Sequence, residues 1–157
     1  MELNTLNCRQ YNSLIKYYSC NLTKVTTNRY FLQANLELNR DLDKGAEIQM
    51  IIFVKFTKEN KVLKFLDLKV KVCDLYDSKM SSLVIKEVIR EMKRVSNFPH
   101  SCPVKGNYAY WLTNFTVTEN FFPTYTPTID FNYTLRFYEK KRLLGDMVIE
   151  GSTLRRS

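Results

Sequence analysis

The sequence predicts a mainly β fold, an immunoglobulin-like antiparallel β-sandwich with one α-helix inserted near residues 77–95. Several stretches alternate apolar and polar residues with the period of two of a strand that has one buried face. One segment has helical periodicity instead. The 157 residues, 45% of them hydrophobic, suffice for a single domain, 1–157, that buries about 70% of its unfolded surface. Stacking two sheets buries such strands most simply, so a sandwich is expected, with a barrel as the alternative.

Three strands are expected in the first half of the chain. The first is 30–38, and the next two, 46–57 and 66–72, form a hairpin around the polar turn 58–61. The apolar residues that share a phase are Tyr30, Leu32, Ala34, Leu36, Leu38, Ala46, Ile48, Met50, Ile52, Val54, Phe56, Leu66, Leu68, Val70 and Val72.

The inserted helix is expected between two cysteines. Asp77 or Ser78 can cap its first turn, and Pro99 limits its end because the residue before a proline is pushed out of the α region. Its apolar face follows the i, i+3, i+4 spacing of a helix. That face consists of Met80, Leu83, Val84, Val88, Ile89, Met92 and Val95.

Strands are also expected at 109–117 and 129–137, and a last, weakly alternating one at 147–154. The total is six or seven. The residues expected to face the interior are Ala109, Trp111, Thr113, Phe115 and Val117 in the first, and Ile129, Phe131, Tyr133, Leu135 and Phe137 in the second. Asn114, Asn132 and Thr134 are expected to face solvent.

The four cysteines predict two disulfides. Their number is even and they lack the C-x₂-C spacing of a zinc site, so reduced thiols in a cytosolic protein are the alternative. Three pairings exist. We favour Cys8–Cys20 and Cys73–Cys102, because each closes a moderate loop worth about 3 to 4 kcal/mol in the chain-entropy model.

Compartment and modification rest on weaker signals. Met1 is followed by polar residues rather than a secretory signal, so the protein is either cytoplasmic or a differently started version of a secreted one. No apolar run is long enough to span a membrane. Sequons for N-glycosylation occur at Asn21, Asn114 and Asn132; three is close to the number expected by chance, but the last two fall on predicted solvent faces.

No pattern of catalytic, cofactor or metal-binding residues is present, so we expect a protein that is not an enzyme. His100 is the only histidine, and no glycine-rich phosphate loop occurs. The net charge of +8 invites a nucleic-acid partner, but the lysines are scattered over several elements. The densest basic clusters, 139–142 and 155–156, have the composition of a turn and a tail. We therefore expect no nucleic-acid binding.

Aromatic residues suggest an apolar cavity. Phe121 and Phe122 lie in the expected loop 119–128, where a strand core does not need them, and could form the mouth of such a cavity. Its expected lining comes from both sheets: Leu36, Ile52, Phe56, Leu68, Trp111, Phe115, Phe131, Leu135 and Phe137.

The sequence resembles a known family. The strand end LKVKVCDL, the run SNFPHSCPVKGNY at 96–108 and the late F-x-x-x-L-R-F-Y strand are similar to the insect family of domain of unknown function 1091. That family is similar to the lipid-recognition (ML) fold of the ganglioside activator protein and includes proteins implicated in contact-pheromone perception. The resemblance implies secretion, a β-sandwich and a hydrophobic ligand held between the sheets, without catalytic residues.

The expected function is therefore that of a secreted protein that binds or carries an apolar small molecule or lipid in chemosensation, with a cell-surface receptor as a further partner. The alternative is a secreted interaction module that acts through a surface such as the exposed helix face. A closed core full of large side chains would favour the alternative.

Overall fold

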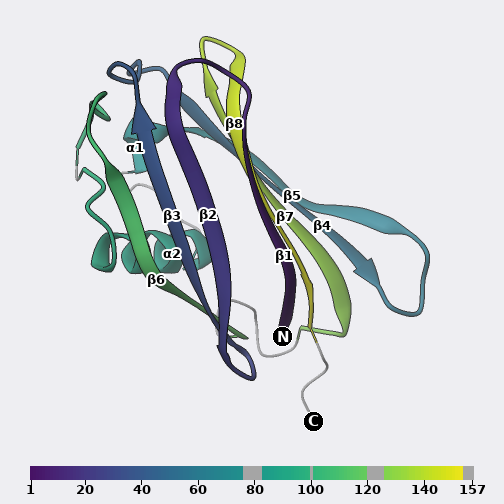
Figure 1. Ribbon diagram of the computed structural model, residues 1–157. Helices are drawn as coiled ribbons and strands as arrows, with labels where there is room; N and C mark the ends of the chain where they lie inside the picture. Colours follow the sequence, from purple (N-terminus) through teal and green to yellow (C-terminus); the bar gives the residue numbers. More distant parts are fainter. Residues whose placement is uncertain (76–82, 100, 120–125, 154–157) are drawn as a thin grey trace.

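The computed structural model of the protein describes residues 1–75, 83–99, 101–119 and 126–153. It is mainly β, as predicted (Figure 1). The elements, in chain order, are β1 Glu2–Gln10, β2 Ile15–Thr26, β3 Arg29–Leu38, β4 Glu47–Phe56, β5 Val62–Lys71, α1 Val72–Leu75, α2 Leu83–Arg94, β6 Tyr110–Thr118, β7 Ile129–Glu139 and β8 Arg142–Ser152.

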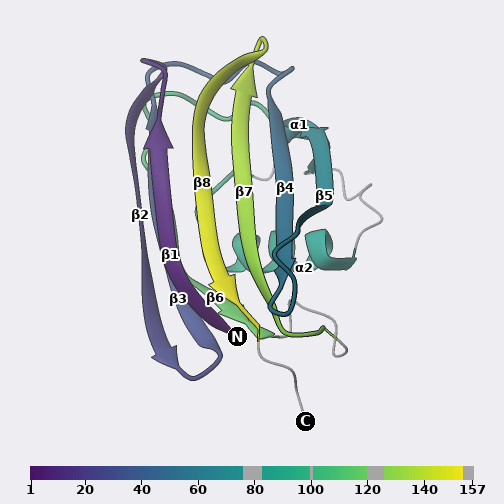
Figure 2. The same cartoon turned by 90° about the vertical axis from the view of Figure 1, so that its right-hand side faces the viewer.

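The strands form two antiparallel sheets, which confirms the predicted sandwich. One sheet has five strands in the order β1-β8-β7-β4-β5, seen side by side in Figure 2. The other has three, in the order β2-β3-β6. The β4–β5 hairpin is present as expected. The cluster 139–142 is the turn between β7 and β8, where Lys140 and Lys141 both have positive φ, as a two-residue hairpin turn of type I′ requires.

The structure contains eight strands in its described part rather than six or seven. The two that the sequence did not reveal, β1 and β2, both contain irregularities: the register of β1 shifts between Leu3 and Thr5, and that of β2 between Ile15 and Tyr17. A bulge adds one residue and reverses the alternation beyond it, so these strands lack a continuous period of two.

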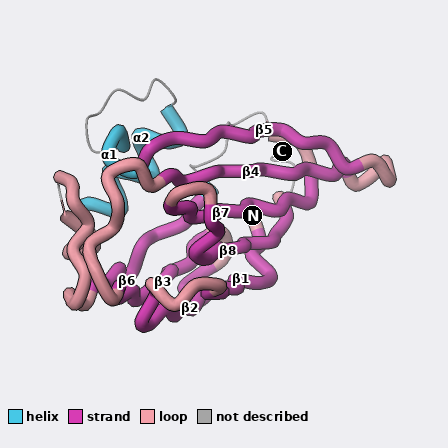
Figure 3. Tube along the Cα trace, turned by 90° about the horizontal axis from the view of Figure 1, so that it is seen from above, coloured by secondary structure: helices cyan, strands magenta, loops and turns pink. Residues whose placement is uncertain are grey.

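The two sheets form a wedge rather than parallel layers. On one side, the edge strands β1 and β2 lie together and are joined by the Cys8–Cys20 disulfide. On the other side, β5 and β6 stand apart, and α2 lies on that side of the gap and contacts β6 (Figure 3). The expected helix start at Asp77 or Ser78 lies outside the described residues.

A β-bulge in β6 corrects the predicted phase of that strand. Leu112 pairs with Ala34 and Phe115 with Leu32, so two residues of β6 stand opposite one residue of β3. Asn114 absorbs the extra residue with φ of 56°, a left-handed conformation that asparagine tolerates. Phe115 therefore faces inward as predicted, but the inward residues before the bulge are Tyr110 and Leu112. The predicted inward residues Ala109, Trp111 and Thr113 are exposed.

The buried core is divided. One cluster of buried side chains lies around Phe131, Tyr30 and Val54, a second around Leu38 and Leu144, and a third around Leu32, Leu112 and Phe115.

A candidate apolar binding cavity

A cavity of about 660 Å³ lies between the two sheets. Its wall is built mainly from the inner faces of β3, β4, β6 and β7, and α2 closes part of the side where the sheets diverge. The volume lies within the range of about 300–1,000 Å³ that is usual for small-molecule sites.

The burial of β4 shows the effect of this space on the side chains around it. The strand is flanked on both sides, by β5 and β7, yet its inward residues Ile48, Met50 and Ile52 are only half-buried. Ile51, which points to the opposite face of the same strand, is 3% exposed. The inner face of β4 keeps accessible surface because it borders a cavity instead of packing against side chains of the facing sheet.

The structure brings seven of the nine expected lining residues together. They are Leu36, Ile52, Phe56, Phe115, Phe131, Leu135 and Phe137.

Two expected lining residues lie elsewhere. Leu68 pairs with Met50 across the β4–β5 ladder but sits on the edge strand, beyond the cavity wall. Trp111 is 44% exposed because it precedes the bulge in β6 and points away from the interior. The expected mouth residues, Phe121 and Phe122, lie outside the described residues, as does His100.

The sequence did not assign several residues of the wall to it. Val88, Ile89 and Met92 of α2 line the cavity, and so do Phe98 and Pro99 after the helix. The three helix residues belong to the apolar face that the sequence predicts for the helix. The sequence does not indicate that the two sheets diverge, and this divergence is what makes the apolar face of α2 part of the cavity wall.

A few tyrosine hydroxyls supply polar groups near the cavity. The Tyr133 hydroxyl donates to Met50 Sδ at 3.0 Å, and burial raises the pKa of Tyr133 to about 12. The Tyr18 hydroxyl donates to the carbonyl oxygen of Asp146 at 3.1 Å. Burial, and secondarily the negative charge of Asp146, raise the pKa of Tyr18 above its ordinary value. Both phenols are therefore neutral over the physiological range of pH.

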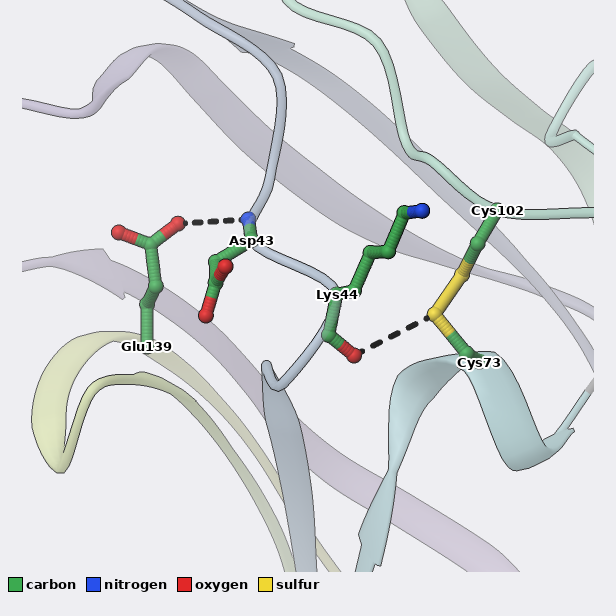
Figure 4. The surroundings of a disulfide bond; sticks show 5 residues. All are labelled: Asp43, Lys44, Cys73, Cys102 and Glu139. Carbon is green, nitrogen blue, oxygen red and sulfur yellow. Dashed lines mark hydrogen bonds between the residues drawn. A yellow bond between two sulfur atoms is a disulfide. The ribbon is translucent and has the colours of Figure 1, made fainter.

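The Cys73–Cys102 disulfide, confirmed like Cys8–Cys20, joins α1 to the segment that follows α2. Figure 4 shows its position beside the connection between β3 and β4, where Cys73 Sγ lies 3.5 Å from the carbonyl oxygen of Lys44. The other side of that connection is held by the Glu139 carboxylate, which accepts a hydrogen bond from the amide of Asp43 at 2.9 Å. The end of the cavity near Val72 and Leu42 is thus fixed from two sides.

The sequons differ in accessibility. Asn21 and Asn114 are exposed, whereas Asn132 is half-buried and accepts a hydrogen bond from Thr134 Oγ1 at 2.6 Å. Thr134, expected to face solvent, is 8% exposed although it lies on the outer face of the sheet. It stands between Ile51 and Val148 of the neighbouring strands, which cover it.

The described residues contain no group of three His, Cys, Asp or Glu side chains arranged to hold a metal ion. No helix among them is long and apolar enough to cross a membrane.

Comparisons with known proteins give one informative match. The family described as "Protein of unknown function (DUF1091)" matches residues 48–133, from β4 to the middle of β7. No curated protein matches the chain. A crystal structure of a protein from Archaeoglobus fulgidus is similar with 8% identity, over 91% of this chain and 98% of that chain, but its TM-score of 0.29 is too low to bear on fold or function.

Proposed function

The chain belongs to the DUF1091 family of proteins of unknown function, and we propose that it is a binding protein for an apolar small molecule, held in the cavity between its sheets. The observation that carries this proposal is the cavity itself. The alternative, an interaction module, calls for a solid core, whereas about 660 Å³ between the sheets here is not filled by side chains.

The chemistry of the wall supports an apolar occupant. The seven predicted lining residues and the helix residues Val88, Ile89 and Met92 carry no polar side-chain atom other than one thioether sulfur. Each CH₂ group transferred from water to such a wall contributes about 0.8 kcal/mol. A chain of about ten carbons can therefore reach micromolar affinity after ordering costs of several kcal/mol.

Secretion and a role in chemosensation complete the proposal. Two disulfides support an oxidising compartment, since such bonds persist mainly outside the cytosol. The sequence motifs resemble the DUF1091 family, and the similarity of that family to the lipid-recognition fold supports the carrier role. A cell-surface receptor is the further partner in this proposal. In this proposal the protein performs no catalytic step.

The test is a binding titration on protein produced through a secretory pathway, so that both disulfides form. An environment-sensitive apolar dye should bind saturably and be displaced by long-chain hydrocarbons. Trp111 is not a suitable reporter, because it lies outside the cavity. An organic extract of the purified protein, analysed by mass spectrometry, should contain the natural ligand.

A pair of variants on one strand locates the binding. Leu135→Trp fills the cavity and should weaken dye binding at least about tenfold, whereas Arg136→Trp puts the same side chain on the opposite face and should leave binding unchanged. Dye binding that responds equally to both variants, or a titration with no saturable signal, would reject the cavity as the site.

A further inference from the structure

The charge of the cavity wall restricts what its ligand can be. No lining residue in the described part of the chain is Lys, Arg or His, and the single charged side chain is the carboxylate of Glu47. The amino group of Met1, another lining residue, is hydrogen-bonded to the Asn28 side chain. An anion buried here would lose its hydration without gaining a cationic side chain, which costs several kcal/mol. Apart from the end of the cavity at Met1, whose amino group carries one positive charge, the wall therefore selects against carboxylates such as fatty-acid anions.

One polar group in the wall is poorly matched. Tyr133 lies on the inner face of β7 beside β4, and its hydroxyl donates to the thioether of Met50, 3.0 Å away. Both residues line the cavity. A thioether sulfur is a weak acceptor, so this buried hydroxyl has a partner that a carbonyl oxygen would improve on.

The other tyrosines of the wall have stronger partners. The Tyr18 hydroxyl donates to the carbonyl oxygen of Asp146, and the Tyr138 hydroxyl donates to Gln49 Oε1 at 3.1 Å. The Tyr110 hydroxyl accepts from the backbone N–H of Lys105 at 2.8 Å. Tyr133 differs from Tyr18 and Tyr138 in donating to sulfur instead of oxygen, and it lies at the middle of the cavity-facing strand β7.

We propose that the ligand is an uncharged lipid with a hydrogen-bond acceptor, such as the carbonyl group of an ester, ketone or aldehyde, which accepts the Tyr133 hydroxyl while the hydrocarbon chain lies along the apolar wall. This inference rests on the proposed function and adds the chemical class of the ligand to it. It distinguishes neutral, carbonyl-bearing chains from pure hydrocarbons and from fatty-acid anions.

The test compares three probes that differ in one end of the molecule: methyl nonanoate, decane and nonanoate. Each displaces the apolar dye from the wild-type protein and from Tyr133→Phe, which removes the hydroxyl and keeps the ring. We expect Tyr133→Phe to weaken methyl nonanoate about fivefold, which corresponds to about 1 kcal/mol, and to leave decane unchanged. Nonanoate should bind the wild type at least about tenfold more weakly than its ester.

Tyr11→Phe is the matched control, because neither Tyr11 nor the partner of its hydroxyl, the Asp146 carboxylate, lines the cavity. It should leave the ratio of ester to decane affinity unchanged. If methyl nonanoate and decane both bind, and the ratio of their affinities is the same in the wild type and in Tyr133→Phe, the role of Tyr133 is overturned and the proposed cavity function stays intact. Nonanoate binding as tightly as the ester would overturn the selection for uncharged ligands. If no probe displaces the dye, the proposed function fails, and this inference with it.

Discussion

At the scale of single residues, the best-defined polar contact is made by Glu139 at the end of β7. Its carboxylate is 5% exposed and accepts two hydrogen bonds from the Arg40 guanidinium, at 3.0 and 2.6 Å, in addition to the amide of Asp43. The hydrogen bonds from Arg40, which have the largest effect, and the one from the Asp43 amide hold the pKa of Glu139 below its ordinary value, although burial acts in the opposite direction. The contact ties the connection between β3 and β4 to the five-stranded sheet.

This contact predicts a pH-dependent contribution to stability. A carboxyl group with a folded pKa below its unfolded value, about 4.3, stabilises the fold above that value and loses the contribution as the pH falls through the folded pKa. Glu139→Gln should therefore lower the free energy of unfolding by about 1 kcal/mol at pH 7, a modest amount because the Arg40 side chain is 58% exposed.

Urea unfolding measured from neutral to acidic pH checks this prediction. The difference between wild type and Glu139→Gln should shrink below about pH 4, as the wild-type carboxylate becomes protonated. Lys16–Glu37, a surface ion pair, supplies a control, since Glu37→Gln should change stability by less than about 0.5 kcal/mol. If the difference in the free energy of unfolding between wild type and Glu139→Gln stays constant down to low pH, the ionised Glu139 carboxylate is not the source of the stabilisation.

Gly106 is a second residue on which local packing depends. A Cβ atom there would lie under 3.0 Å from the backbone carbonyl carbon, Cα and nitrogen of Arg40, and backbone cannot move aside as a flexible side chain can. Gly106→Ala should therefore destabilise the protein by about 3 kcal/mol or more. Gly45→Ala is the control, because its Cβ would meet only the Asp43 carboxylate, at 3.3 Å, and it should change stability by less than about 1 kcal/mol. Thermal unfolding of both variants tests this prediction. Equal unfolding midpoints for Gly106→Ala and Gly45→Ala would show that Gly106 does not lie against the Arg40 backbone.

At the scale of elements, the two disulfides have different tasks. Cys8–Cys20 joins neighbouring edge strands, whereas Cys73–Cys102 closes a loop that contains α2, with a sequence separation of 29 between the cysteines. The chain-entropy model gives about 3 kcal/mol for the first and about 4 kcal/mol for the second, because a longer loop has more freedom to lose. The second bond also holds the helix that closes one side of the cavity.

Replacing Cys73 and Cys102 together with serine should therefore lower the free energy of unfolding by about 2–5 kcal/mol and weaken binding of the apolar dye. The Cys8→Ser, Cys20→Ser variant should lower stability by a similar amount but affect dye binding less, because that bond joins β1 to β2 and does not hold α2. Peptide mapping without reductant should first find both bonds in the wild type. If the protein without the Cys73–Cys102 disulfide binds the dye as tightly as the wild type, α2 does not form part of the binding wall.

At the scale of the whole molecule, the sequence predicts the sandwich but not its shape. Regular alternation in β3, β4 and β7 fixes their inner faces, and the residues that these strands contribute to the cavity follow from it. Trp111 was misplaced because Asn114 adopts a left-handed conformation that shifts the phase of β6, and nothing in the alternation marks where a bulge falls. The helix residues of the wall were missed because the angle between two sheets depends on contacts far apart in sequence.

The joining of the sheets along one edge has a consequence for the size of the ligand. β1 and β2 are tied together by Cys8–Cys20, whereas β5 and β6, at the far edges of the two sheets, are not paired with each other. The distance between the sheets therefore increases from the joined edge toward β5 and β6. The girth of a molecule held between the sheets is limited most at the joined edge and least at the far edge.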